Sequence, residues 1–196
     1  MALHLYQVDA FTNRLFGGNP AAVVSLSEWL PDDVMGAIAA ENNLSETAFF
    51  IPAGDSGVDF HLRWFTPTVE VDLCGHATLA SAFVPFSELA WQSDTLRFTT
   101  ASGLLSACRR DDGMITLDFP ARLGRGMDLP EGLESAMGQT VVDFRRAVMN
   151  MAVLQDESAV YAVKPDLDYI RHLEGDGLII TAAGGSCDCV SRYFAP

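Results

Sequence analysis

Residues 58–84 read VDFHLRWFTPTVEVDLCGHATLASAFV and carry two different hydrophobic periods. Up to Trp64, apolar and polar residues alternate, and this period of two predicts a β-strand with one buried face. The Thr-Pro pair that follows ends the strand, since proline cannot donate to a sheet ladder. The later part is rich in alanine and predicts a helix over residues 77–84 that Pro85 stops.

The turn between these two elements is Cys74-Gly75-His76. Glycine lets a ligand approach the backbone closely, and the free N–H groups of a first helical turn attract anions. A carboxylate could bind there, with His76 supplying a further donor or a proton. The same residues are equally compatible with a plain helix start in which Cys74 is a small core residue.

Outward from this stretch, the same criteria predict an α+β protein in which strands outnumber helices. Predicted strands cover residues 3–10, 21–26, 47–51, 104–109, 114–119, 144–154, 159–163, 178–181 and 190–194. Predicted helices cover a segment from Pro31 to Asn42-Asn43, residues 130–137 and residues 165–173.

An internal echo indicates two related halves. The sequence RWFTP at residues 63–67 recurs as RYFAP at residues 192–196, each time after a helix and a short apolar strand. The segment from 120 to 130 contains two glycines and begins and ends with proline, which is typical of a boundary. We therefore expect one half over residues 1–119 and a second over residues 121–196.

Composition excludes several classes of protein. Of the 196 residues, 49% are hydrophobic, and 12 basic against 26 acidic residues give a net charge of −14, which disfavours nucleic acid and anionic membranes as partners. No run approaches the roughly 18 apolar residues of a membrane-spanning helix, and the N-terminus shows no signal-peptide pattern. Four cysteines without a CxxC pair predict reduced thiols in a cytoplasmic protein and no metal site.

Three further residues are candidates for chemistry, each with a plainer alternative. Glu46 lies between a predicted helix and an apolar strand, where desolvation would raise the pKa of its carboxyl group into the range that general acid–base catalysis needs. The plainer alternative is a solvated loop residue, which is what most glutamates are. Asn19 follows two glycines and is either a ligand donor or a turn residue. Asp72 could orient Cys74 or bind a metal, or it is an ordinary surface aspartate.

Several segments together resemble the PhzF-like isomerase family of phenazine biosynthesis, which shares the diaminopimelate-epimerase fold. They are VDAF at 8–11, FGGNPAAV at 16–23, NLSETAF at 43–49, RWFTP at 63–67, VEVDLCGHATLA at 69–80 and DCVSRYFAP at 188–196. The resemblance implies two similar halves, each a curved sheet around a central helix, with the active site in the cleft between them.

The resemblance also implies an activity and its residues. It implies a cofactor-independent, dimeric isomerase that moves a proton between carbons of a small carboxylated metabolite. Its acid–base glutamate falls on Glu46 and its substrate-site histidine on His76. The residues expected to bind substrate are Asn19, Asp72, Cys74, Gly75 and Ala77. Cys74 matches one of two catalytic thiols in the related epimerases, but no second Cys-Gly turn follows, which disfavours two-base racemisation.

One departure from the family pattern bears on activity. Members of the family continue beyond the Arg-aromatic-Phe-Ala-Pro segment into an acidic stretch and a Thr-Gly-Ser turn that opens a second central helix. By that comparison the half over residues 121–196 is expected to lack its last helix and strands. The rival expectation is therefore a shortened, non-catalytic binding or assembly module, and a thiol enzyme built on Cys74 is a more distant alternative.

Overall fold

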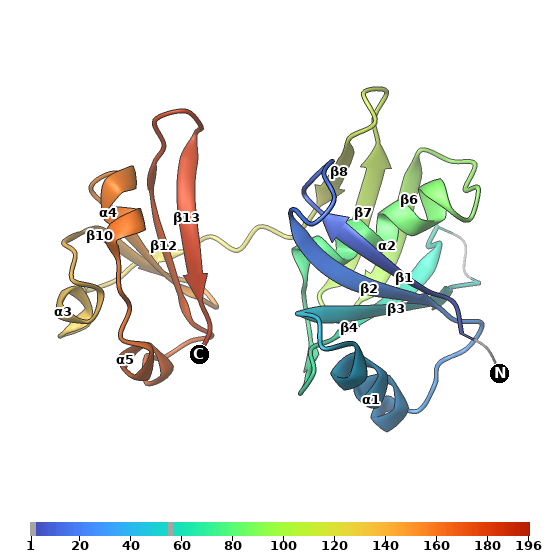
Figure 1. Ribbon diagram of the computed structural model, residues 1–196, viewed down its shortest axis with the longest axis horizontal. Helices are drawn as coiled ribbons and strands as arrows, with labels where there is room; N and C mark the ends of the chain where they lie inside the picture. Colours follow the sequence, from blue (N-terminus) through green and yellow to red (C-terminus); the bar gives the residue numbers. More distant parts are fainter. Residues whose placement is uncertain (1–2, 55–56) are drawn as a thin grey trace. The chain divides into compact units, whose positions relative to one another are not determined.

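The computed structural model describes residues 3–54 and 57–196 and divides into two compact units, Met1–Pro120 and Ala121–Pro196 (Figure 1). Each unit has its own sheet and its own hydrophobic core. Among the residues that the structure describes, no helix is long and apolar enough to cross a membrane.

Unit 1 is built on an eight-stranded sheet with the order β1-β2-β3-β4-β6-β7-β8, and β5 pairs with β4 outside this path. Its strands are β1 (Leu5–Ala10), β2 (Asn19–Ser25), β3 (Glu46–Pro52), β4 (Phe60–Phe65), β5 (Glu70–Val71), β6 (Thr95–Thr100), β7 (Gly103–Arg109) and β8 (Ile115–Asp118). The β2–β3 and β4–β6 pairs are parallel and the other pairs are antiparallel.

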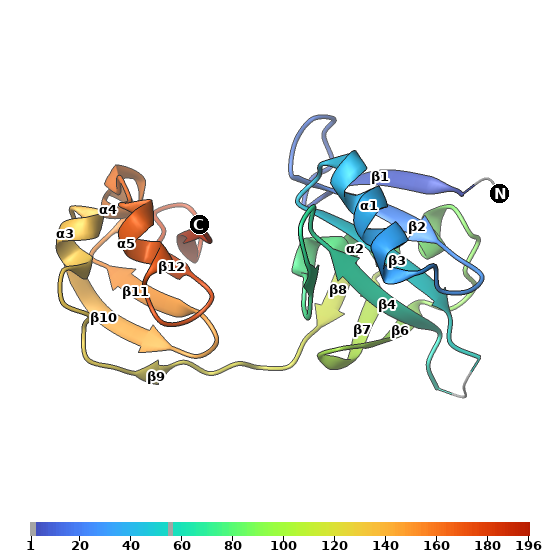
Figure 2. The ribbon, with the colours of Figure 1, turned by 90° about the horizontal axis from the view of Figure 1, so that it is seen from below.

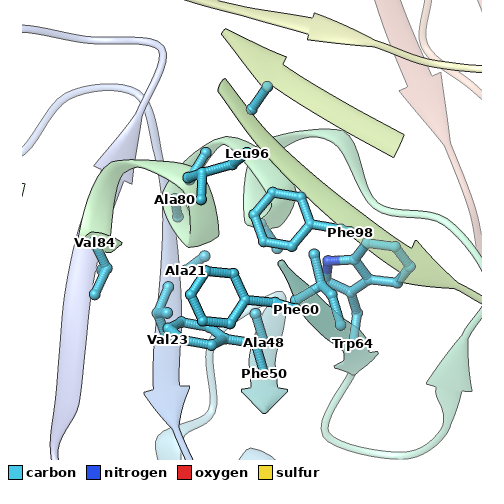
Figure 3. Packing of buried hydrophobic residues seen from close by; sticks show 14 of the residues in the cluster. Ala21, Val23, Ala48, Phe50, Phe60, Trp64, Ala80, Val84, Leu96 and Phe98 are labelled. Atoms are coloured by element: carbon cyan, nitrogen blue, oxygen red, sulfur yellow. The ribbon is translucent and has the colours of Figure 1, made fainter. Parts of the chain in front are cut away.

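The two faces of this sheet carry different helices. Helix α1 (Asp32–Asn42) lies across β3 and β4 (Figure 2) and covers a small cluster that includes Phe49. Helix α2 (Gly75–Ser87) packs against the opposite face, where Ala48, Phe50 and Trp64 meet its alanine-rich surface (Figure 3). Because strand side chains alternate between faces, the order of residues in β3 decides which helix each side chain meets.

Helix α2 continues past Pro85, so the prediction that this proline stops the helix was wrong. A proline there removes only the hydrogen bond to the Ser81 carbonyl, one turn before the helix ends. Val84, Pro85 and Phe86 are all buried, and their packing offsets that loss. The strand β6 was not predicted, although Leu96 and Phe98 alternate with polar residues along it.

Unit 2 is a five-stranded sheet with the order β13-β12-β11-β10-β9, in which only the β11–β12 pair is parallel. Its strands are β9 (Arg125–Gly126), β10 (Val141–Arg146), β11 (Asn150–Leu154), β12 (Leu178–Ala183) and β13 (Cys189–Phe194). Helices α3 (Leu133–Met137), α4 (Glu157–Ala162) and α5 (Leu167–Arg171) gather on one side of it and share a single core cluster (Figure 1).

Two predictions for unit 2 were wrong. Residues 144–154 form parts of two antiparallel strands, β10 and β11, with a reversal in which the Ala147 N–H donates to the Met149 carbonyl. Residues 159–163 were expected to be a strand, but most of them lie in α4. The cause is a helix cap, because the Asp156 carboxylate accepts the Ala159 N–H at 2.9 Å.

The two units repeat one pairing pattern. In β1-β2-β3-β4 and in β10-β11-β12-β13 the successive pairs are antiparallel, parallel and antiparallel. The echoed segments RWF and RYF end β4 and β13, where Phe65 lies opposite Thr47 and Phe194 lies opposite Leu178. The echo therefore marks equivalent strands in two related sheets.

Candidate functional site

Glu46 is placed by the start of a strand. It is the first residue of β3 and lies opposite Ala21 of β2. Helix α1 ends at Asn42, and the left-handed backbone of the capping residue Asn43 turns the chain toward β3. By strand alternation Glu46 shares a face with Ala48, which is the face that α2 covers. The carboxylate thus points toward α2 while its side chain keeps 19% exposure.

The start of α2 brings two side chains to Glu46. Cys74 is the extended residue before the helix, and His76 is its second residue. The Nε2 atom of His76 lies 3.1 Å from Oε2 of Glu46. The other ring nitrogen, Nδ1, lies 3.5 Å from the Cys74 sulfur. The imidazole therefore stands between a carboxylate and a thiol.

The His76–Glu46 contact is close without being a hydrogen bond. Both Oε2 of Glu46 and Nε2 of His76 are buried, and neither has a hydrogen-bond partner with acceptable geometry. A buried polar atom left unpaired costs about 1–3 kcal/mol, so such atoms are rare in proteins and often mark functional positions. The two atoms therefore carry hydrogen-bonding capacity that the described residues leave unused.

The Cys74 thiol is held in its neutral form. Burial raises its pKa to about 12, and the negative charge of Glu46 acts in the same direction. The backbone N–H groups of Ala77 and His76 oppose this rise without cancelling it. Because the thiolate is the nucleophilic form of cysteine, this environment disfavours the thiol-enzyme alternative.

The backbone at the start of α2 is accessible at one position. A side chain on Gly75 would meet no atom within 4 Å, so open space lies beside its α-carbon. The first turn of the helix carries N–H groups without helical partners, and these favour an anion. Ala77 is fully buried, and its backbone N–H faces the Cys74 sulfur.

Asn19 lies near the same end of the sheet as Glu46. It is the first residue of β2, two residues before Ala21, and therefore on the same face. The backbone requires glycine in the turn before it, because a side chain on Gly18 would clash with the Ala10 carbonyl oxygen. The glycine turn thus leads directly into β2 and places Asn19 at its first position.

Asp72 is the predicted site residue that stands apart. It is exposed, and its backbone carbonyl accepts the Ser102 hydroxyl at 2.8 Å. The structure brings together Glu46, Cys74 and His76, and the contact between the thiol and the imidazole was not foreseen. Their i, i+2 spacing at a helix start is the signal that could have indicated it.

Two cavities are lined by other residues than this cluster. Both belong to unit 2, with volumes of about 300 and 200 Å³. The larger is lined mainly by the segment 170–177 and the last two residues, and it contains no grouping of acid, base and thiol. The chemistry of the Glu46 cluster, rather than cavity size, therefore locates the candidate site.

Comparison with known proteins assigns the chain to a family. A family model for phenazine biosynthesis-like proteins, PhzC-PhzF, matches residues 8–196. The chain belongs to this PhzF family. An uncharacterized isomerase of Pseudomonas aeruginosa is 46% identical to it over 196 residues, which cover all of this chain and 74% of the relative.

Solved structures agree with the family and its fold. A PhzF-family protein from Enterococcus faecalis is 44% identical and matches all of this chain and 74% of its own with a TM-score of 0.90. A hydroxyproline epimerase from Agrobacterium vitis shares the fold at 12% identity and a TM-score of 0.58, over 97% of this chain and 68% of its own. The expected diaminopimelate-epimerase-like α+β fold is confirmed.

Proposed function

We propose that this protein is a cofactor-independent isomerase that moves a proton between carbon atoms of a small carboxylated metabolite. The observation that carries the proposal is the buried, unpaired contact of 3.1 Å between Glu46 and His76. Membership of a family whose relatives are named isomerases supports the reaction class. Glu46 is the general acid–base group in this proposal.

The proposed reaction uses one base. The Glu46 carboxylate removes a proton from a carbon of the substrate, and the electron pair left behind moves through an adjacent double bond. The resulting carboxylic acid returns the proton to the far carbon, so that the enzyme ends in its starting state. Substrate polar groups would pair with the free Nε2 of His76, which satisfies an atom that is otherwise orphaned.

The substrate carboxylate is proposed to bind at the start of α2. The space beside Gly75 and the N–H groups of the first turn supply a local positive potential. This local effect has to act against a net charge of −14, which weakens long-range attraction of an anion. Asn19 is proposed as a further donor at the same end of the sheet.

The test is exchange at carbon in deuterated water, followed by proton NMR with a panel of small unsaturated carboxylates that includes a dihydro-hydroxyanthranilate. The wild type is expected to exchange one carbon-bound proton of a substrate. Glu46→Gln should slow the exchange by about 10²- to 10⁴-fold. Glu41→Gln, at an exposed site in α1, is the matched control and should exchange at the wild-type rate. Equal rates in wild type and Glu46→Gln would contradict the proposed role.

A non-catalytic binding module is the second candidate, and one feature of unit 2 favours it. Gly177 precedes Leu178 in β12 as Glu46 precedes Thr47 in β3, so unit 2 carries no carboxylate at the equivalent position. In this case a carboxylated ligand should bind, as measured by calorimetry, without exchange of any carbon-bound proton.

The isomerase proposal also includes a cytoplasmic homodimer. Light scattering after size-exclusion chromatography tests whether the protein is a dimer.

A further inference from the structure

We propose that Glu46, Cys74 and His76 form a binding site for Zn²⁺. One potential ligand atom from each residue, a carboxylate oxygen, a sulfur and a ring nitrogen, lies within 4.8 Å of the other two. Bond lengths to zinc of about 2.0–2.3 Å place neighbouring ligands of a tetrahedral site about 3.5 Å apart. The ion would bind Nε2 of His76 beside Glu46, so the Cys74 sulfur, which now lies next to Nδ1, has to rotate toward Nε2 to complete the three ligands.

Two of the potential ligand atoms are buried without a hydrogen-bond partner among the described residues. His76 is 9% exposed, and its Nε2 and the Oε2 of Glu46 are buried without hydrogen bonds. A metal ion satisfies both atoms at once, which no group of the described protein does. The Glu46 side chain is 19% exposed, so one edge of the cluster borders solvent.

The donor set selects the type of ion. One sulfur, one imidazole nitrogen and one carboxylate oxygen match the N, O and S ligands of zinc and not the all-oxygen sets of Mg²⁺ or Ca²⁺. Three protein ligands leave the fourth tetrahedral position open to water. The net charge of −14 also raises the local concentration of a divalent cation, although it opposes an anionic substrate.

Binding exchanges one proton for one ion. The Cys74 S–H bond breaks, its proton passes to buffer, and the sulfur forms a bond to zinc while His76 and Glu46 donate electron pairs. The two anionic ligands neutralise the ion, as a buried charge requires. Because the ion occupies the Glu46 carboxylate, bound zinc should inhibit proton transfer reversibly. That consequence rests on the proposed function, whereas zinc binding does not.

The experiment measures metal binding directly on the full chain. Isothermal calorimetry with ZnCl₂, after treatment with a chelator, gives stoichiometry and Kd. Cd²⁺ serves as a spectroscopic probe, because a cadmium–thiolate bond produces an ultraviolet charge-transfer band. Cys74→Ser and Glu46→Gln test the site, and the double variant Cys187→Ser/Cys189→Ser controls for the exposed thiols. Circular dichroism and Tm report the folding of each variant.

One zinc per chain is expected, with a cadmium–thiolate band. Cys74→Ser should lose the band, and each of the two site variants should bind zinc about 100-fold more weakly. The double variant should keep the band and the zinc affinity of the wild type. The proposal is overturned if no stoichiometric binding occurs, or if binding survives Cys74→Ser and disappears in the double variant. If zinc binds as described but no exchange activity is found, the metal site stands and the isomerase proposal fails.

Discussion

Units 1 and 2 share a strand pattern and differ in what covers it. In unit 1, the face formed by Val23, Ala48 and Trp64 is fully buried beneath α2. The register aligns these three positions with Met151, Ile179 and Tyr193 of unit 2. Those residues are only partly buried, and Tyr193 is 49% exposed. The described helices of unit 2 all contribute to the core on the other face.

The difference shows where the chemistry comes from. Equivalent strands by themselves supply no site, since the counterpart of Glu46 in unit 2 is Gly177. The site in unit 1 arises because α2 crosses the sheet face and brings Cys74 and His76 to the end of β3. A helix start on a strand end thus converts a shared scaffold into a candidate reaction centre.

The largest expected difference concerns the reactivity of cysteines in the two units. Cys74 is buried with a pKa raised to about 12, whereas Cys187 and Cys189 of unit 2 are exposed. At pH 7.5 a thiol with that pKa is ionised in roughly one molecule in ten thousand or fewer. Iodoacetamide should therefore modify the exposed thiols at least about 1,000-fold faster than Cys74, as followed by peptide mass spectrometry.

The pH dependence of this reactivity has a definite sign. The raised pKa of Cys74 means that the folded protein favours the neutral thiol. The neutral thiol therefore contributes its full stabilisation below the ordinary pKa of cysteine, and this contribution is lost as the pH rises toward 12. Alkylation of Cys74 should accelerate steeply with pH over that range. Rapid alkylation of Cys74 at neutral pH would contradict the account of its burial.

The second prediction compares the aligned aromatic residues. Trp64→Ala should destabilise unit 1 by about 3–5 kcal/mol, because it opens a cavity in a fully buried cluster. Tyr193→Ala removes a half-exposed ring and one hydrogen bond from its hydroxyl to the Asp176 carbonyl, and should cost about 1 kcal/mol.

The chain offers a separate readout for each unit in urea denaturation. All three tryptophans, including Trp29 and Trp91, lie in unit 1, so their fluorescence reports that unit, while far-ultraviolet circular dichroism reports both. Equal losses of stability in Trp64→Ala and Tyr193→Ala would break the comparison, because they would mean that both faces are equally covered.

Much of unit 1 could be predicted from local sequence. The alternation that ends at Trp64 predicted β4, and the Cys-Gly-His turn predicted the start of α2. The roles assigned to Glu46 and His76 stay predictions, because they came from the family resemblance. What local sequence could not supply was their distance, since 30 residues separate them and only the packing of α2 on the sheet brings them together.

The two incorrect strand predictions in unit 2 have physical causes. The run from Ala159 to Val163 is apolar and contains two β-branched residues and an aromatic one, which favours a strand by composition. The helix forms instead because Asp156 caps its N-terminus. An aspartate just before the apolar run is a helix-start signal that the sequence already contained. The unbroken strand expected over 144–154 overlooked a reversal that contains no glycine or proline.

The third prediction tests a buried polar side chain of unit 2 that has an apolar counterpart in unit 1. Asn150 is fully buried, donates to the carbonyls of Glu174 and Gly177, and accepts from Arg146 at 2.8 Å. Its counterpart in unit 1 is Ala22, which lies opposite Thr47 as Asn150 lies opposite Leu178. The equivalent position of unit 1 therefore cannot form a side-chain network of this kind.

Asn150→Ala leaves buried polar groups unpaired and should cost unit 2 about 2–3 kcal/mol. The change should appear in circular dichroism, with the tryptophan transition at its wild-type midpoint. Val142→Ala, at a 65% exposed position of β10, is the control and should change stability by less than about 0.5 kcal/mol. A shifted tryptophan transition in Asn150→Ala would show that the two units unfold together.

The smallest expected effect separates the two arginines of the echo. Arg63 lies over the Phe65 ring at 5.1 Å, and Arg192 lies over the Phe194 ring at 5.0 Å, so each stacks on the aromatic residue two positions later. Their polar partners differ. Arg63 donates to the carboxylates of Glu70 and Asp32, whereas Arg192 donates to backbone carbonyls at the end of α4.

Arg63→Gln and Arg192→Gln should each cost about 1 kcal/mol, but only the cost at Arg63 should fall in high salt, because ions screen its exposed carboxylate partners. Arg63 also lowers the pKa of Asp32, so this ion pair contributes at neutral pH and is lost as the pH falls into the acid range. The carbonyl partners of Arg192 do not titrate. Urea denaturation of both variants at low and high salt measures the difference. Equal salt dependence in the two variants would mean that the shared stacking on phenylalanine sets the contribution of each arginine, and that the different polar partners do not.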